Sequence, residues 1–198
     1  DGSVWKELSD MSLLMVRVAD PTETDHTHVN SKSTLFVHGG VDHHWIDELL
    51  ESTLDSTSDS LVTQINRAAK LRMAASSSPL ADMSASISPL WNRDLAQVSE
   101  AYVCEHHLPS LLKRFQVARI VVGHTPQRDQ RMKGLCDNRI ILADASMSAW
   151  MRKSEYSSVE DSADYGIVGN PSVLLMRRIR MEALYWSFTH CSHAKANQ

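Results

Sequence analysis

The sequence has few cysteines, and nothing in their spacing suggests that they act together. The 198 residues include only Cys104, Cys136 and Cys191, an odd number with no CxxC pair among them. Such usage argues against a disulfide framework and fits a reducing compartment. We therefore expect an intracellular protein, located in the cytoplasm, in which Cys104 is packed against apolar neighbours.

Excess positive charge and long apolar runs are also missing. The formal net charge is -4 with ten neutral histidines, so the chain lacks the basic surface that binds nucleic acid or anionic lipid. No stretch approaches the roughly 18 apolar residues that span a bilayer. We expect no nucleic-acid partner and no membrane. The chain begins Asp1-Gly2, without methionine or a leader pattern, and we expect it to start partway through a longer protein.

The remaining composition is that of a globular domain, with 42% hydrophobic and 22% charged residues. Short apolar runs predict strands, and apolar residues at helical spacing predict helices. The strands are expected at 12–18, 34–37, 119–122, 139–143, 172–178 and 183–188, and the helices at 42–71 (with a break at 55–60) and 95–115. This order predicts a layered α/β domain with a mixed sheet.

Two local features qualify this outline. Pro109 falls inside the second helical pattern, where its missing N–H predicts a boundary or kink near Leu108. The stretch 75–89 is rich in serine and contains two prolines, and is interpreted as a loop or flexible insertion outside the core.

Two predicted strands end in a histidine beside glycine. His38 precedes Gly39-Gly40, and His124 follows Gly123. Ligands of open α/β sheets bind beyond the carboxyl ends of the strands, so two such histidines on neighbouring strands can meet at one metal ion. A single histidine at such a position is usually an ordinary turn residue, and only the matched context of the pair favours the metal site.

Other histidine clusters are interpreted without metal. The string Asp42-His43-His44 is interpreted as a solvated loop that opens the next helix. The Glu105-His106-His107 segment is expected on an exposed helix face, and the 190–193 segment in a frayed tail. The His26-Thr27-His28 string lacks the Asp-His pair that would complete a metal motif.

Five segments, taken together, resemble one family. They are 36–41 (FVHGGV), 89–93 (PLWNR), 119–127 (RIVVGHTPQ), 141–148 (ILADASMS) and 169–174 (GNPSVL). In this order they resemble the calcineurin-like metallophosphoesterases, specifically the Shewanella-like (bacterial-like) phosphoprotein phosphatases. The resemblance spans roughly residues 34 to 176 and implies part of an α/β/β/α sandwich with a mixed sheet and helices packed outside. Residues 1–188 would form this part, and 189–198 a tail.

The resemblance also implies roles for individual residues. His38 and His124 would be neutral ligands of one ion in a site for two divalent metal ions (Mn, Fe or Zn), and Arg93 would bind the substrate phosphate. Asp144 would be a structural residue near the site. The implied activity is hydrolysis of phosphate monoesters, with a phosphoprotein as the substrate class.

The chain departs from the family pattern because the GDxHG, GDxxDRG and GNHE motifs, which supply the other ligands and the catalytic His-Asp pair, are absent from the sequence. We therefore expect a C-terminal fragment, weak or no metal binding and no appreciable hydrolysis by this chain alone, with the missing N-terminal half as a possible partner. A truncated gene model is one form of this hypothesis. The alternative is a non-catalytic pseudophosphatase that acts as a binding or scaffold module.

Overall fold

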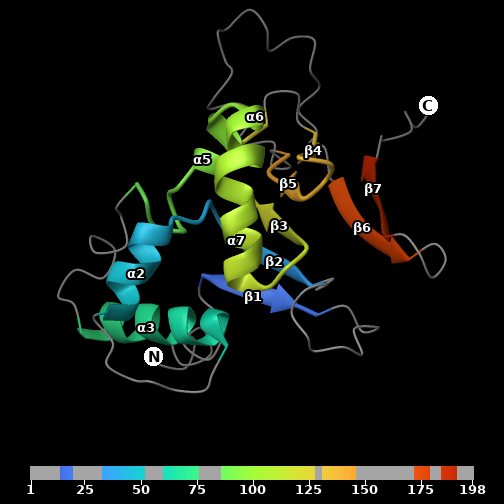
Figure 1. Ribbon diagram of the computed structural model, residues 1–198. Coiled ribbons are helices and arrows are strands. Elements are labelled where there is room, and N and C mark those ends of the chain that lie inside the picture. Colours follow the sequence, from blue (N-terminus) through green and yellow to red (C-terminus); the bar gives the residue numbers. More distant parts are fainter. Residues whose placement is uncertain are drawn as a thin grey trace, which may run out of the picture.

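A computed structural model describes residues 14–19, 33–51, 60–75, 86–127, 131–145, 172–178 and 184–190. Its main element is a five-stranded mixed sheet in the order β1-β2-β3-β5-β4 (Figure 1). The strands are β1 (Met15–Val18), β2 (Thr34–Val37), β3 (Arg119–Val122), β4 (Lys133–Leu135) and β5 (Ile140–Leu142). Strands β2, β3 and β5 are parallel, and β1 and β4 pair antiparallel at the two edges. The predicted α/β class with a mixed sheet is confirmed.

The three central strands are continuous apolar runs because they are covered on both faces. Leu35, Ile120, Ile140 and Ile141 are fully buried, as expected for parallel strands inside an α/β domain. The predicted bounds of β2 and β3 are confirmed, whereas β1 and β5 are shorter than expected. The sequence analysis missed β4, a three-residue strand with a glycine at its centre.

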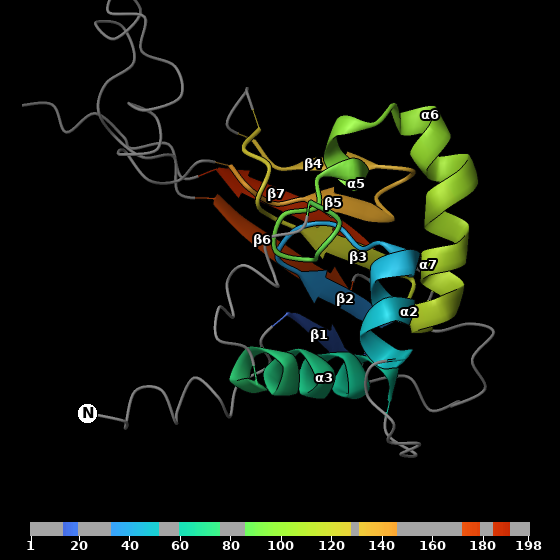
Figure 2. The same ribbon diagram turned by 90° about the vertical axis from the view of Figure 1, so that its left-hand side faces the viewer.

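Two helices follow β2, as predicted. Helix α2 (His43–Glu51) begins after Asp42, whose side chain caps it by accepting a hydrogen bond from the Trp45 amide at 2.9 Å. Helix α3 (Leu61–Ala75) lies beside α2 and the β1 edge, and Figure 2 shows it running next to β1. Leu71, expected on its apolar face, is 53% exposed.

The predicted helix at 95–115 is divided into shorter pieces. Helices α5 (Asp94–Gln97) and α6 (Glu100–Tyr102) are followed by the π-helical turn η2 (Val103–His107) and by α7 (Leu108–Phe115). The boundary expected near Leu108 is confirmed, with Pro109 in the first turn of α7. Val98 and Tyr102, which one continuous helix would place with the apolar residues of this segment, are exposed, because the interruptions change which residues turn inward.

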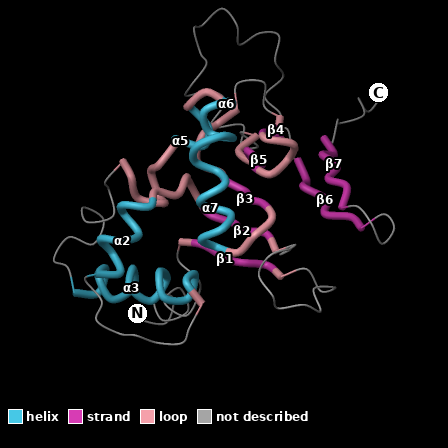
Figure 3. Tube along the Cα trace, viewed as in Figure 1, coloured by secondary structure: helices cyan, strands magenta, loops and turns pink. Residues whose placement is uncertain are grey.

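A separate two-stranded antiparallel sheet is formed by β6 (Ser172–Arg178) and β7 (Leu184–His190). Figure 1 draws this hairpin on the opposite side of the main sheet from α2 and α3, and Figure 3 shows the two sheets as distinct groups of strands. Strand β7 continues two residues past its expected end. The sandwich implied by the resemblance, with its boundary at residue 188, stays a prediction.

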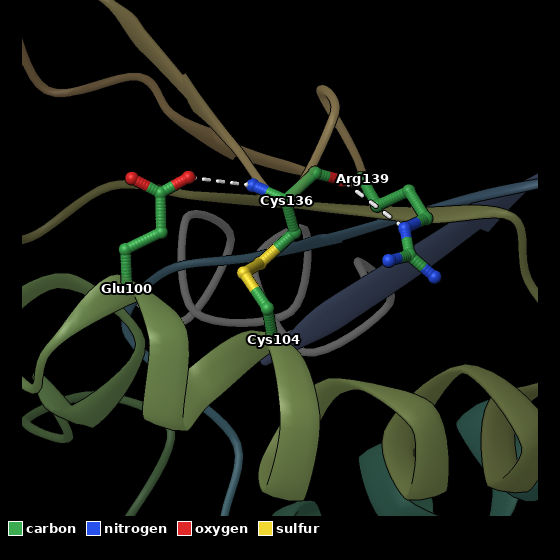
Figure 4. The surroundings of a disulfide bond; sticks show 4 residues. All are labelled: Glu100, Cys104, Cys136 and Arg139. Carbon is green, nitrogen blue, oxygen red and sulfur yellow. Dashed lines mark hydrogen bonds between the residues drawn. A yellow bond between two sulfur atoms is a disulfide. The ribbon is translucent and has the colours of Figure 1, made fainter.

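The expectation that the cysteines form no disulfide is wrong. Cys104 in η2 and Cys136 in the turn between β4 and β5 are disulfide-bonded, with Cα atoms 5.4 Å apart (Figure 4). The Cys136 amide donates to Glu100 Oε1 at 3.0 Å, and the Arg139 side chain donates to the Cys136 carbonyl at 3.1 Å. The cysteine argument therefore no longer supports a cytoplasmic location.

Strand β5 leaves this same turn, in which Cys136, Asp137 and Asn138 all adopt left-handed backbone angles, with φ of 54°, 56° and 60°. Residues with a Cβ atom avoid this region unless the surroundings hold them there. The disulfide and the two hydrogen bonds at Cys136 supply that support.

Among the described helices, none is long and apolar enough to cross a membrane.

Candidate active site

The two glycine-flanked histidines lie at one edge of the sheet. Val37 and Val122 are register partners in the parallel pair β2–β3, so the residues that follow leave the sheet side by side. The Gly123 amide donates to the His38 carbonyl at 2.8 Å, which joins the two strand ends. His38 Nε2 then lies 3.1 Å from His124 Nδ1. The structure therefore brings together the pair that the sequence singled out.

His124 takes an unusual backbone conformation to reach this position. Its φ is 60°, in the left-handed region that costs a non-glycine residue on the order of 1 kcal/mol. Gly123 beside it has no Cβ, and one placed there would lie 3.2 Å from the His38 carbonyl oxygen. Conformational strain of this kind collects at functional sites, where a side chain must be aimed in one direction.

The turn that carries Arg93 is fixed to the glycines after His38. The Gly39 amide donates to the Pro89 carbonyl and the Gly40 amide to the Asn92 carbonyl, each at 2.7 Å. A Cβ on Gly39 would lie 2.7 Å from the Asn92 carbonyl oxygen, closer than any real Cβ contact. The paired glycines therefore allow the backbone before Arg93 to approach the end of β2.

The end of the serine-rich stretch belongs to this turn and is not a detached insertion. Ser88 is completely buried, and its carbonyl accepts the amides of Trp91 and Asn92 at 2.9 and 2.8 Å. Asn92 is buried as well, and its side chain bonds with Asp94 in both directions. The loop interpretation holds for residues 86–91 as a turn, but Ser88 lies in the packed interior. Residues 76–85 lie outside the described part of the chain.

The charges around His124 favour its neutral form. Burial lowers the pKa of His124, the positive charge of Arg93 lowers it further, and His38 adds to the effect. The carboxylate of Asp144 acts in the opposite direction. A neutral imidazole is the form that binds a metal ion. Arg93 and Asp144 therefore both act on this histidine, which places the predicted phosphate-binding residue in the electrostatic surroundings of the pair.

The nitrogen geometry suits a shared ion. Two ring nitrogens that each lie about 2.1 Å from one ion, at an angle of about 90–110°, are about 3.0–3.4 Å apart. The observed separation is 3.1 Å. Without an ion, one ring donates its N–H to the other at the same distance. His124 Nε2 is buried and has no hydrogen-bond partner among the described residues, although ligand histidines usually donate this second N–H.

The ligand set in the described ranges is small. No group of three or more His, Cys, Asp or Glu side chains that could hold a metal ion occurs there. The two imidazoles fit one ion in the separation of their nitrogens and in chemistry, but a stable site needs further ligands. The Asp144 carbonyl accepts the Gln127 amide at 2.9 Å, which joins the segment after β5 to the segment after His124.

Sequence reasoning assigned no role to Trp91, although it quoted this residue in the PLWNR segment. The indole is 50% exposed, and its ring centroid lies 5.3 Å from that of His124, with the rings nearly perpendicular at 86°. The sequence signal for a role of Trp91 was its position directly after Pro89-Leu90 and two residues before Arg93.

A second polar cluster connects α2 to α7. Arg114 forms an ion pair with Asp47 and donates to His43 Nδ1 at 3.1 Å. Because Nδ1 accepts this bond, the hydrogen of His43 lies on Nε2, which bonds Ser110 Oγ at 2.9 Å. Ser110 in turn donates to the His107 carbonyl. Because Arg114 occupies Nδ1, the His43 ring donates to the serine and does not act as its base. The cluster is a connection between helices, so His43 lies in a helix-to-helix contact as well as opening α2.

Comparisons with known proteins give partial matches in sequence and in structure. No known protein family matches it. It is 29% identical over 143 residues to "Uncharacterized protein C1840.07c" of Schizosaccharomyces pombe, covering 72% of this chain and 39% of that protein. The chain thus spans about two fifths of the length of this relative.

Solved structures give a similar partial match. A cold-active protein-tyrosine phosphatase of a psychrophilic Shewanella species is 28% identical with a TM-score of 0.40, and another structure titled as a cold-active protein tyrosine phosphatase is 27% identical with a TM-score of 0.34. Each match covers 57% of this chain and 31% of the other. TM-scores this low do not establish a shared fold, so the function is argued from the residues of the site.

Proposed function

We propose that His38, His124 and Arg93 belong to a metal-dependent phosphoesterase site that hydrolyses phosphate monoesters, with phosphoproteins as the substrate class. The observation that carries the proposal is the 3.1 Å approach of His38 Nε2 and His124 Nδ1 at the carboxyl ends of two parallel strands. The order of the five family-like segments in the sequence supports the same reaction class. Two divalent ions, when bound, would supply a hydroxide nucleophile near neutral pH and stabilise the attacking and leaving oxygens.

The residues of the chain have separate tasks in this proposal. His38 and His124 hold one ion through neutral imidazoles, and the surroundings of His124 already favour its neutral form. Arg93 binds two phosphate oxygens, because its planar guanidinium matches their spacing. The turn that carries Arg93 is fixed by the Gly39 and Gly40 amides, which orients the phosphate relative to the imidazoles. The motifs that supply the further ligands and the catalytic His-Asp pair in the similar family are absent from this sequence, so we propose that another polypeptide segment supplies them.

Metal binding tests this proposal directly, and it does not depend on turnover. Titration of the chain with Zn²⁺ against a chromophoric chelator should show one weak site, because two imidazoles alone leave the ion open to competing ligands. His124→Asn keeps a residue that tolerates the left-handed backbone while removing the imidazole, and His38→Gln removes the other ligand. We expect each change to weaken binding at least tenfold, on the order of the loss of a ligand contact.

His44→Ala is the matched control, because it removes an exposed histidine from α2 and should leave the affinity unchanged. Equal losses in all three variants would mean that the ion binds to scattered surface histidines, and the proposal would fail. If the metal binds but the chain binds phosphate no more tightly than the Arg93→Ala variant does, the result would instead favour the pseudophosphatase alternative.

A further inference from the structure

Trp91 is a large apolar side chain that the protein displays beside the candidate site. Half of its surface is exposed, and its ring lies 5.3 Å from His124. Leu95, four residues further along the chain, is buried in the core, whereas half of Trp91 faces solvent. The side chain therefore contributes less to the core than its size allows.

The backbone around Trp91 is held rigidly, so this exposure is built into the turn. Its amide donates to the buried Ser88 carbonyl at 2.9 Å, and the next amide, of Asn92, donates to the same oxygen. Gly39 and Gly40 fix the carbonyls on either side, at Pro89 and Asn92. The indole is thus presented from a fixed backbone between two anchors, next to the imidazole pair and two residues before Arg93.

We propose that Trp91 is a specificity-determining residue that contacts the aromatic ring of an aryl phosphate monoester, of which phosphotyrosine is the protein-borne example. The inference rests on the proposed function, because it places the phosphate at Arg93 and the imidazole pair. In an aryl phosphate only the bridging oxygen separates the phosphorus from the ring, so the ring falls next to the site, where the indole lies. A phosphoserine-type ester offers a short aliphatic group there and gains little from an aromatic surface.

Ligand binding tests the inference without requiring hydrolysis. The full chain is titrated with inorganic phosphate, methyl phosphate and phenyl phosphate in Mn²⁺-containing buffer, by isothermal titration calorimetry. An aromatic contact contributes roughly 0.5–1.5 kcal/mol beyond the buried area, so phenyl phosphate should bind about threefold to tenfold more tightly than methyl phosphate. Trp91→Ala should abolish this preference, and Trp91→Phe should keep most of it. Inorganic phosphate, which carries no organic group, is the reference, so each preference is read as the ratio of the phenyl phosphate or methyl phosphate affinity to the inorganic phosphate affinity of the same variant.

Leu71→Ala is the control, because Leu71 is an equally exposed apolar residue on α3 and should leave all three affinities unchanged. If phosphate binds but the wild type shows no preference for phenyl phosphate, or Trp91→Ala retains the preference, the inference is wrong while the proposed function stands. If Trp91→Ala weakens all three ligands equally, Trp91 acts only by shielding His124, and the inference is again overturned. If no ligand binds, both the proposed function and the inference fail.

Discussion

Breaking the Cys104–Cys136 disulfide should remove a large part of the stability of the protein. The bond joins residues separated by 32 positions, and the loop-entropy relation assigns about 3–4 kcal/mol to a loop of this length. For a chain of this size each kcal/mol corresponds to roughly 2–4 °C in the melting temperature, so the expected decrease is about 6–16 °C. The turn at Cys136 also loses the constraint that helps hold three consecutive left-handed residues.

The assay is thermal unfolding followed by circular dichroism, with and without a dithiol reductant. The starting protein carries Cys191→Ser, so that no third thiol can exchange with the pair. Cys104→Ser, Cys136→Ser and the double variant should all melt at the same reduced temperature, because each removes the same bond. Reductant should lower the melting temperature of the starting protein to that value and leave the three variants unchanged.

Several results would contradict this reasoning. A decrease in the free energy of unfolding of less than about 1 kcal/mol would mean that the loop is already ordered in the unfolded chain or that the disulfide is not formed. A reductant effect that persists in Cys104→Ser would point to a different pairing. Unequal melting temperatures of the two single variants would show that packing at one position, and not the covalent link, decides the stability.

Two further predictions concern the contacts made by α2 and α3. Burial lowers the pKa of His43, and the positive charge of Arg114 adds to this, so the fold favours the neutral ring. The free energy of unfolding should therefore fall as pH decreases from about 6.5 through the folded pKa. Urea unfolding at several pH values should show a smaller fall in His43→Gln, and an equal fall would argue against the assignment to His43. Asn66 is buried and makes three hydrogen bonds with the backbone at the start of β1. Asn66→Ala should lower the free energy of unfolding by about 2–4 kcal/mol, and Asn66→Asp should lower it at least as much at neutral pH, because a buried carboxylate cannot donate to the Met15 carbonyl. A loss below about 1 kcal/mol for alanine would show that water replaces the side chain.

Much of the fold and the central pair of the site follow from local patterns in the sequence. The bounds of β2 and β3 could be predicted because each apolar run ends beside a glycine-containing turn, and the start of β6 because its apolar run follows a Gly-Asn-Pro string in the sequence. His38 and His124 could be paired because both follow such runs, and the carboxyl ends of parallel strands share one edge. The approach of the two rings is thus a consequence of strand order and register.

The features that were missed depend on contacts between distant segments. No local pattern near Cys104 predicts that it pairs with Cys136. The two cysteines meet only because β5 pairs with β3 and η2 packs near the turn that precedes β5. The exposure of Tyr102 arises from a π-helical turn and a broken helix, which change the phase of an otherwise regular pattern. Ser88 lies in a serine-rich stretch whose composition indicates a loop, although its carbonyl anchors the Trp91 turn.

The parallel pairing of β2 and β3 also determines how tolerant the histidine pair is to evolutionary change. His38 and His124 are 86 positions apart in the chain, yet the ladder between the two strands sets their spacing, and the length of the intervening connection does not. Insertions and deletions accumulating in that connection therefore leave the two imidazoles in contact, whereas a slip of one residue in either strand separates them at once.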